Sequence, residues 1–234
     1  MCGRFSIAVR IGYLADRFGV SEPGGITLPL YNIAPGEEVP VIARSGNAQC
    51  IIMQWGLIPS WTKDEKSSPA PINARAEGLN EKKLFRTLLS HGRCIVPATG
   101  FYEWKKSGNE KYPVYFRLKS QETFGMAGLC DSWQGPDGSI TWSFTIITTS
   151  PNSLVLPVHN RMPAMLKQED EKTWLDPKFG AFEELSPLLN PYPSVGMESY
   201  RVTKKVNHPS FKSDTAVQEE IPVTNTSPGM WETR

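Results

Sequence analysis

The sequence predicts an α+β fold: a single domain built on a curved, mostly antiparallel, barrel-like sheet flanked by helices. Strand-like segments follow one another in pairs joined by turn sequences. The few helical segments do not alternate strictly with strands, which argues against a doubly wound fold. The 234 residues contain 39% hydrophobic residues and no internal repeat or low-complexity linker, so one domain can bury a full core.

The second half of the chain carries the clearest strand pattern. CIVPATGFYEWKK, the turn SGNE and KYPVYFRLK predict one hairpin, and FGMAGLCDSW and ITWSFTIITT, joined by QGPDGS, predict a second pair. QCIIMQW is typical of a buried strand, and MESYRVTKKV predicts the last strand. The proline-rich run ITLPLYNIAPGEEVPVI excludes a helix and predicts an irregular segment with short strands. These segments together supply the antiparallel sheet.

Apolar residues at helical spacing predict a helix over 10–18 that stops at Gly19, and another over 80–90 that ends before Gly92. Two further helices are predicted over 168–175 and 180–189. We therefore expect one domain over 1–234, with its core within about 2–205 and a C-terminal extension over 206–234. The extension has little periodicity and is expected to wrap the body loosely.

Charge and cysteine usage exclude several classes of protein. The formal net charge is +1, without a polybasic tail, so nucleic-acid contact requires a local basic patch. A signal peptide and an 18-residue apolar run are both absent, which favours a cytoplasmic protein. The four cysteines form no CxxC pair and lack zinc-site spacing, so no metal is expected. Cys50, Cys94 and Cys130 are expected to be buried reduced thiols, and Cys2 is expected to lie outside the core.

The chain begins MCGRF, which places a cysteine directly after the initiator methionine. Removal of Met1 would leave Cys2 with a free α-amine and a thiol on adjacent carbons. Both groups have an appreciable nucleophilic fraction near neutral pH. Such a 1,2-aminothiol captures an aldehyde as an imine, and the sulfur then closes a thiazolidine ring. Taken alone, Cys2 is better explained as the residue that happens to follow the start codon.

Polar residues in apolar or turn-forming surroundings give further candidates. In a strand, Glu103 would face the same side as Phe101, and a carboxylate buried there would have a raised pKa and could transfer protons. His159 lies between Pro157 and Pro163, a rigid setting. Each has a structural alternative: Glu103 could face solvent from an edge strand, and His159 could be a hydrogen-bonded structural histidine.

Asn73 follows a proline-rich loop, and a helix N-cap explains it as well as a functional role does. Arg75 follows Asn73 by two positions, as Arg161 follows His159. In a strand this spacing would point both side chains of a pair to one face. The combination indicates more than any single residue.

MCGRF, WGLIPSW, NARAE, CIVPATGFYEW and HNRMPAML, in this order, resemble the SOS-response-associated peptidase (SRAP) family of abasic-site-processing proteins. The resemblance runs from residue 2 to about residue 205 and implies a single SRAP domain. It implies a catalytic set consisting of Cys2, Asn73, Glu103 and His159. It also implies DNA contacts by Arg4, Arg75, Arg161, Trp61 and Trp104, the two tryptophans forming an aromatic wedge.

The resemblance implies that Cys2, once Met1 is removed, forms a covalent thiazolidine with the ring-opened sugar of an abasic site in single-stranded DNA. A weak abasic-site lyase activity would accompany the crosslink, and removal of Met1 could be autocatalytic. The implied partner is abasic single-stranded DNA in a bacterial cytoplasm, at damage sites on the nucleoid, without metal or cofactor. Two alternatives stay open: an N-terminal-nucleophile thiol peptidase acting on protein, and a noncatalytic single-strand binder in which Cys2 is incidental.

Overall fold

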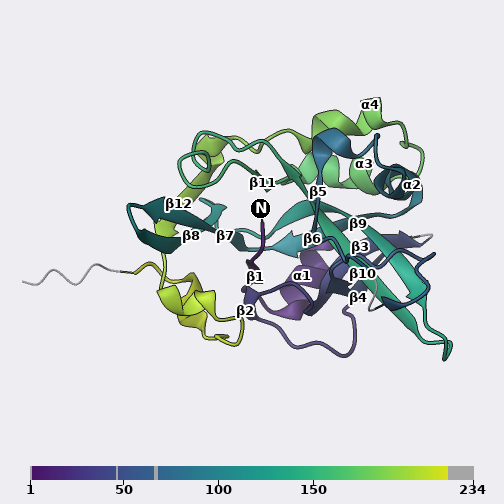
Figure 1. The fold of residues 1–234 in the computed structure, drawn as a ribbon, viewed down its shortest axis with the longest axis horizontal. Helices are drawn as coiled ribbons and strands as arrows, with labels where there is room; N and C mark the ends of the chain where they lie inside the picture. Colours follow the sequence, from purple (N-terminus) through teal and green to yellow (C-terminus); the bar gives the residue numbers. More distant parts are fainter. Residues whose placement is uncertain (1, 46, 66–67, 221–234) are drawn as a thin grey trace, which may run out of the picture.

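The computed structural model describes residues 2–45, 47–65 and 68–220 (Figure 1). Its strands divide into two sheets. One sheet has the order β12-β8-β7-β1-β2, formed by Met197–Arg201, Glu110–Leu118, Gly100–Ser107, Phe5–Ile7 and Leu30–Ile33. The second sheet contains β3 (Glu38–Ser45), β4 (Asn47–Trp55), β5 (Asn73–Arg75), β6 (Arg93–Ala98), β9 (Phe124–Gln134), β10 (Ile140–Thr149) and β11 (Met162–Pro163).

Five strands of the second sheet close into a barrel. The pairing runs from β10 through β4, β3, β6 and β9 and returns to β10, so this ring leaves no open edge. Most pairs are antiparallel, but β10 pairs in parallel with both β4 and β5. The expected α+β fold with a barrel-like, mostly antiparallel sheet is confirmed, with a second, five-stranded sheet beside the barrel.

The helices lie close to their predicted positions. They are α1 (Ile11–Phe18), α2 (Lys83–His91), α3 (Glu171–Leu175) and α4 (Phe182–Leu185), and short 3-10 turns include η2 (Ala76–Gly78), η3 (Gln168–Asp170), η4 (Ser186–Leu189), η5 (Ser194–Gly196), η6 (Lys204–Asn207) and η7 (Asp214–Val217). Gly19 ends α1 in the left-handed conformation, with φ of 64°. Within the part of the chain that the structure describes, no helix combines the length and the apolar character required to cross a membrane.

Two predicted strands are wrong in extent. CIVPATGFYEWKK is not one strand, because β6 belongs to the barrel and β7 to the five-stranded sheet. Thr99 lies between them and ties the junction to β1, since its backbone N–H donates to the Ser6 carbonyl at 2.8 Å. The last strand ends at Arg201, and the chain then enters η6. The chain therefore passes from the barrel into the five-stranded sheet two residues before Phe101.

The main core lies between the two sheets and inside the barrel. It combines Phe5, Phe101 and Phe116 of the five-stranded sheet with barrel residues such as Met126 and Ile146. Alternation along β7 explains this arrangement, because Phe101 joins the main core while Tyr102 enters a second cluster on the opposite face. The five-stranded sheet is therefore buried on both faces near its centre.

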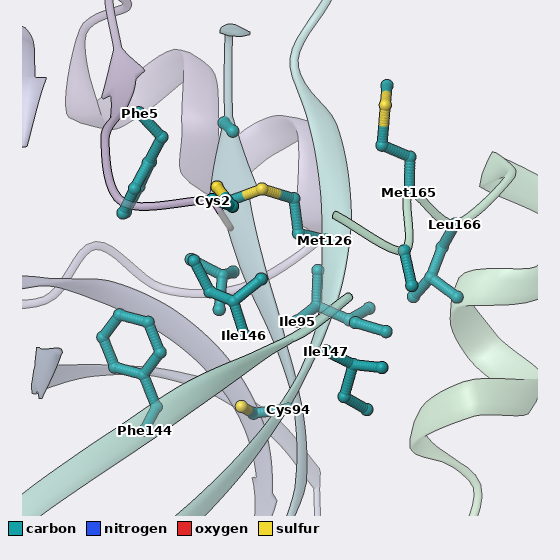
Figure 2. Packing of buried hydrophobic residues seen from close by; sticks show 14 of the residues in the cluster. Cys2, Phe5, Cys94, Ile95, Met126, Phe144, Ile146, Ile147, Met165 and Leu166 are labelled. Carbon is teal, nitrogen blue, oxygen red and sulfur yellow. The ribbon is translucent and has the colours of Figure 1, made fainter. Parts of the chain in front are cut away.

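Cys2 belongs to this main core, which corrects the expectation that it lies outside one. Its side chain is fully buried, and Figure 2 shows it among Phe5, Met126 and Ile146. These partners are distant in sequence, so the local segment MCGRF gives no sign of them. The prediction of buried thiols is confirmed for Cys94 and Cys130, whereas Cys50 is only half-buried.

The described part of the C-terminal extension is held firmly, contrary to the expected loose wrapping. Residues 202–217 cover Tyr102 and Tyr115 on the second face of the five-stranded sheet. Buried Asn32 fixes this segment, because its Nδ2 donates to the carbonyls of Val206, His208 and Phe211 at 3.3, 3.1 and 2.9 Å. The portion over 221–234 lies outside the described residues.

Replacing Asn32 with alanine would leave the Arg4 guanidinium, which donates to Asn32 Oδ1 at 2.7 Å, without that acceptor. Three carbonyls would also lose a donor. We expect Asn32→Ala to lower the free energy of unfolding by about 3 kcal/mol, as measured by urea denaturation. The exposed Asn80→Ala is the matched control and should change it by less than about 0.5 kcal/mol. Equal effects of the two substitutions would contradict the anchoring role of Asn32.

Candidate active site around Cys2

Asn73 holds the backbone of Cys2. It begins β5, whose parallel pairing places Asn73 opposite Ile146 of β10, at the wall of the cluster that surrounds Cys2. The Asn73 Nδ2 donates to the Cys2 carbonyl at 2.8 Å. The Asn73 Oδ1 is buried and has no hydrogen-bond partner among the described residues. Asn73 is therefore a strand residue rather than a helix N-cap, and its amide presents an unused acceptor beside Cys2.

Glu103 supplies a buried carboxyl at the same place. It lies on β7 opposite Val114 and on the same face as Phe101, and it is only 3% exposed. Burial raises its pKa to about 7, because the ionised form loses hydration. The predicted buried orientation of Glu103 is confirmed. A carboxyl with this pKa can both donate and accept a proton near neutral pH.

His159 lies against Glu103. Its Nδ1 is 3.8 Å from the Glu103 Oε1, and the backbone N–H of Arg161 donates to the same Nδ1 at 3.0 Å. The same Nδ1 also lies 3.2 Å from the Arg161 carbonyl oxygen. Burial, together with the neighbouring charges of Lys111 and Arg161, lowers the pKa of His159. The imidazole is therefore held mainly neutral at physiological pH, beside a carboxyl that titrates close to pH 7.

The Cys2 thiol is kept in its protonated form. Its burial is the main cause of a strongly raised pKa, and the negative charge of Glu103 acts in the same direction. Glu103 lies on the same face of β7 as Phe101, which belongs to the same core cluster as Cys2. The structure thus gathers Cys2, Asn73, Glu103 and His159 at one place, although they come from four separate parts of the chain.

Arg75 and Arg161 line a common cavity of about 390 Å³, which none of the four catalytic candidates lines. Arg75 is exposed on β5, two residues after Asn73. Arg161 precedes β11, and its guanidinium donates to both carboxylate oxygens of Glu77 at 2.7 and 2.9 Å. It also donates to the carbonyl of Thr148, which fixes its orientation. These two arginines are the ones among the predicted DNA-contacting residues that share a cavity.

Arg4 and Trp104 form a separate pair on the other face of the five-stranded sheet. The Arg4 guanidinium lies 5.8 Å from the centroid of the Trp104 ring, and its Nη1 donates to Asn32 and to the Val206 carbonyl. The Trp104 Nε1 donates to the Asn207 side chain at 2.7 Å. In this arrangement Arg4 is occupied by acceptors of the protein, and a DNA contact by Arg4 or Trp104 stays a prediction.

Trp61 lies elsewhere, next to α2. It is 71% exposed and borders a hollow of about 450 Å³ with Leu84, Leu88 and Asp131. None of the catalytic candidates lines that hollow. Stacking of Trp61 on a DNA base is compatible with this exposure and stays a prediction. Across residues 2–45, 47–65 and 68–220, His, Cys, Asp and Glu side chains form no group of three or more that could bind a metal ion.

Two residues that hold predicted arginines in place are not identified by the sequence. Glu77 ends the motif NARAE and pairs with Arg161, and its only sequence signal is its place two positions after Arg75. Asn32, on β2, accepts a hydrogen bond from Arg4. Its sequence signal is a lone amide between Tyr31 and Ile33. Neither signal identifies its partner, because each partner lies dozens of residues away.

Known proteins resemble this chain over most of its length. Residues 1–209 match the model of the SOS response associated peptidase (SRAP) family, and the chain belongs to this family. It is 42% identical over 222 residues to the abasic site processing protein YoqW of Bacillus subtilis (strain 168), covering 93% of this chain and 99% of YoqW.

Two proteins of lower sequence identity are also similar to this chain. The abasic site processing protein HMCES of Xenopus tropicalis is 32% identical over 212 residues, which span 77% of this chain and 63% of HMCES. A crystal structure of a Bacteroides thetaiotaomicron protein superposes with a TM-score of 0.85 at 31% identity. That match covers 94% of this chain and all of the other.

The raised pKa of Glu103 has a consequence for stability. Between the ordinary value of 4.5 and the folded value of about 7, the folded protein binds more protons than the unfolded chain. Stability should therefore fall as pH rises through this window, by on the order of 3 kcal/mol relative to Glu103→Gln, which does not titrate. Urea denaturation of both proteins from pH 4.5 to 8 measures the difference. Parallel curves for the two proteins would show that the carboxyl is not destabilised by burial.

Proposed function

We propose that this protein captures abasic sites in single-stranded DNA by forming a covalent thiazolidine through Cys2 after removal of Met1. The proposal is supported by one observation: Asn73 bonds to the backbone of Cys2, and Glu103 and His159 form a pair in the same region of the fold. The names of the relatives, which are abasic site processing proteins, point to the same lesion. Met1 lies outside the described residues.

The reaction begins with opening of the abasic sugar, which exists mostly as a closed hemiacetal. Opening requires a proton at the ring oxygen and removal of one from the anomeric hydroxyl. Glu103 suits both transfers, because its pKa is raised to about 7 by burial. The exposed aldehyde is then attacked by the Cys2 amine, and the resulting carbinolamine loses water to give an imine. Asn73 would keep the amine in place through its hydrogen bond to the Cys2 carbonyl.

Ring closure follows when the Cys2 sulfur adds to the imine carbon. The sum of the steps is one aldehyde plus one aminothiol giving one thiazolidine and one water. Because burial keeps the thiol protonated, sulfur attack requires transfer of its proton to a neighbouring base. Glu103, ionised after donating a proton to the departing water, can accept it, and His159 lies beside it as a second carrier.

Closure of the ring protects the DNA strand. A protonated imine acidifies the C2′ proton of the sugar and promotes β-elimination, which cleaves the strand. The saturated thiazolidine lacks this electron sink. We therefore propose a stable crosslink as the main product and weak lyase activity as the side reaction.

DNA would be bound as a single strand in a bacterial cytoplasm. Arg75 and Arg161 border one cavity, each lies two positions after a proposed catalytic residue, and both are suited to backbone phosphates. Exposed Trp61 and half-buried Trp104 would stack on bases, at roughly 1–3 kcal/mol per base. A few such local contacts, rather than a broad basic face, suit a chain whose net charge is only +1.

A thiol peptidase is the alternative, and the description of the family favours considering it. An N-terminal-nucleophile hydrolase would use the Cys2 sulfur on an amide with the α-amine as base. That chemistry requires a thiolate, whereas burial and the charge of Glu103 strongly disfavour one here. The amine-first route to an imine has no such requirement, and we propose it in preference.

The proposal is tested by incubating the mature protein with a single-stranded oligonucleotide whose uracil has been excised. We expect an adduct that survives denaturation, with an intact mass equal to protein plus oligonucleotide minus one water. Cys2→Ser should abolish this adduct, because an oxazolidine is much less stable than a thiazolidine, whereas Cys50→Ser should retain it. Unmodified oligonucleotide with the wild-type protein, or an adduct that depends on Cys50, would refute the proposal.

Removing only the sulfur separates the two nucleophiles of Cys2. Cys2→Ala keeps the amine, so borohydride should still trap an imine, and strand cleavage should rise several-fold because the ring cannot close. Denaturing gels of the labelled oligonucleotide quantify both products. Cleavage equal to or below that of the wild-type protein would contradict the protective role of ring closure.

A further inference from the structure

An ion pair joins Arg161 to Glu77, and both residues line the cavity of about 390 Å³. Both guanidinium Nη atoms of Arg161 donate to the two oxygens of Glu77, at 2.7 and 2.9 Å. The side chain of Arg161 is 14% exposed and that of Glu77 is 56% exposed. Arg161 is therefore held by its surroundings, and Glu77 is free to turn outward into solvent.

The charges around this cavity suit a phosphate group. Its lining includes the cations Arg75, Lys82 and Arg161 and the carboxylates Glu77 and Glu81. The guanidinium fork matches the oxygens of a phosphate as well as those of a carboxylate. The buried Nε of Arg161 has no hydrogen-bond partner among the described residues, so the guanidinium retains an unused donor. Without Glu77, the cavity would have three positive charges facing one negative charge.

We propose that Glu77 is a specificity-determining residue that occupies the phosphate-binding fork of Arg161 and is displaced by a phosphate of the DNA backbone. This inference rests on the proposed function, because it assigns that fork to single-stranded DNA. The hydrogen bonds from Arg161 to Thr148 keep the fork oriented while the carboxylate leaves. The carboxylate thus holds the place of the phosphate in the absence of DNA.

Competition by Glu77 affects intact and abasic DNA differently. An intact strand gains a phosphate contact but loses the Glu77 pair, so its residence on the protein is shortened. An abasic strand suffers the same loss at first, but the covalent bond then retains it. Glu77 would in this way prevent the protein from being occupied by undamaged single strands, which share the same backbone.

The experiment compares wild type, Glu77→Gln and Glu81→Gln in binding a fluorescent undamaged oligothymidine, followed by anisotropy at fixed salt. Glu81 lines the same cavity, and no ion pair joins it to Arg161 among the described residues, so its substitution is a control of equal charge. We expect Glu77→Gln to bind about two- to fivefold more tightly than wild type, the range for loss of an exposed ion pair. Glu81→Gln should change the Kd less than half as much as Glu77→Gln does.

Selectivity is measured by adduct formation on an abasic oligonucleotide in the presence of excess undamaged strand. The competitor should slow Glu77→Gln more than it slows wild type or Glu81→Gln. Equal tightening by both substitutions would show a general charge effect and overturn the proposal, as would unchanged or weaker binding by folded Glu77→Gln. Thermal unfolding reports the folding of each variant. If Glu77→Gln does not fold, Glu77→Asp, which is too short to fill the fork, must tighten binding or the proposal fails.

The two proposals fail in different ways. If wild type forms no adduct but Glu77→Gln still binds undamaged DNA more tightly than Glu81→Gln, the assignment of the fork stands and the crosslinking function is wrong. If wild type forms the adduct and the two substitutions behave alike, only the role of Glu77 is wrong.

Discussion

The structure depends on the burial of its own chain start between the barrel and the five-stranded sheet. Cys2 lies in the main core, and its carbonyl accepts a hydrogen bond from Asn73 of the strand β5. Two residues later, Arg4 is fixed by Asn32 and by the Val206 carbonyl on the other face. A terminus usually frays, but this one is tied from both sides. The side chain of Cys2 is thereby given a defined position.

The same burial determines the electrostatics of the site. Excluding water raises the pKa of Glu103 to about 7 and raises that of the Cys2 thiol as well, and the negative charge of Glu103 raises the thiol pKa further. His159 is kept mainly neutral by its own burial. One physical cause thus gives an acid that can exchange protons at neutral pH, a protonated thiol and a neutral imidazole. This combination suits condensation with an aldehyde better than attack by a thiolate.

The three arginines that were predicted to contact DNA differ in their surroundings. Arg4 is buried and its contacts stabilise the fold, joining the N-terminal segment to residues 202–217. Arg75 and Arg161 border an open cavity, where a charged ligand can reach them. A position at the cavity rather than residue type therefore distinguishes Arg75 and Arg161 from the structural Arg4. Glu77 is also accessible from solvent, since more than half of its side chain is exposed while it is paired with Arg161.

The sequence alone determined the α+β class, the first and second helices, both antiparallel pairs and the inward direction of Glu103, because these follow from local periodicity and turn chemistry. It also indicated Asn73 and His159 as unusual polar residues. Only the tertiary structure decided that β6 and β7 belong to different sheets, that Cys2 is buried and that Asn32 holds the C-terminal segment. Local pattern cannot encode these features, because each arises from contacts between segments that are far apart along the chain.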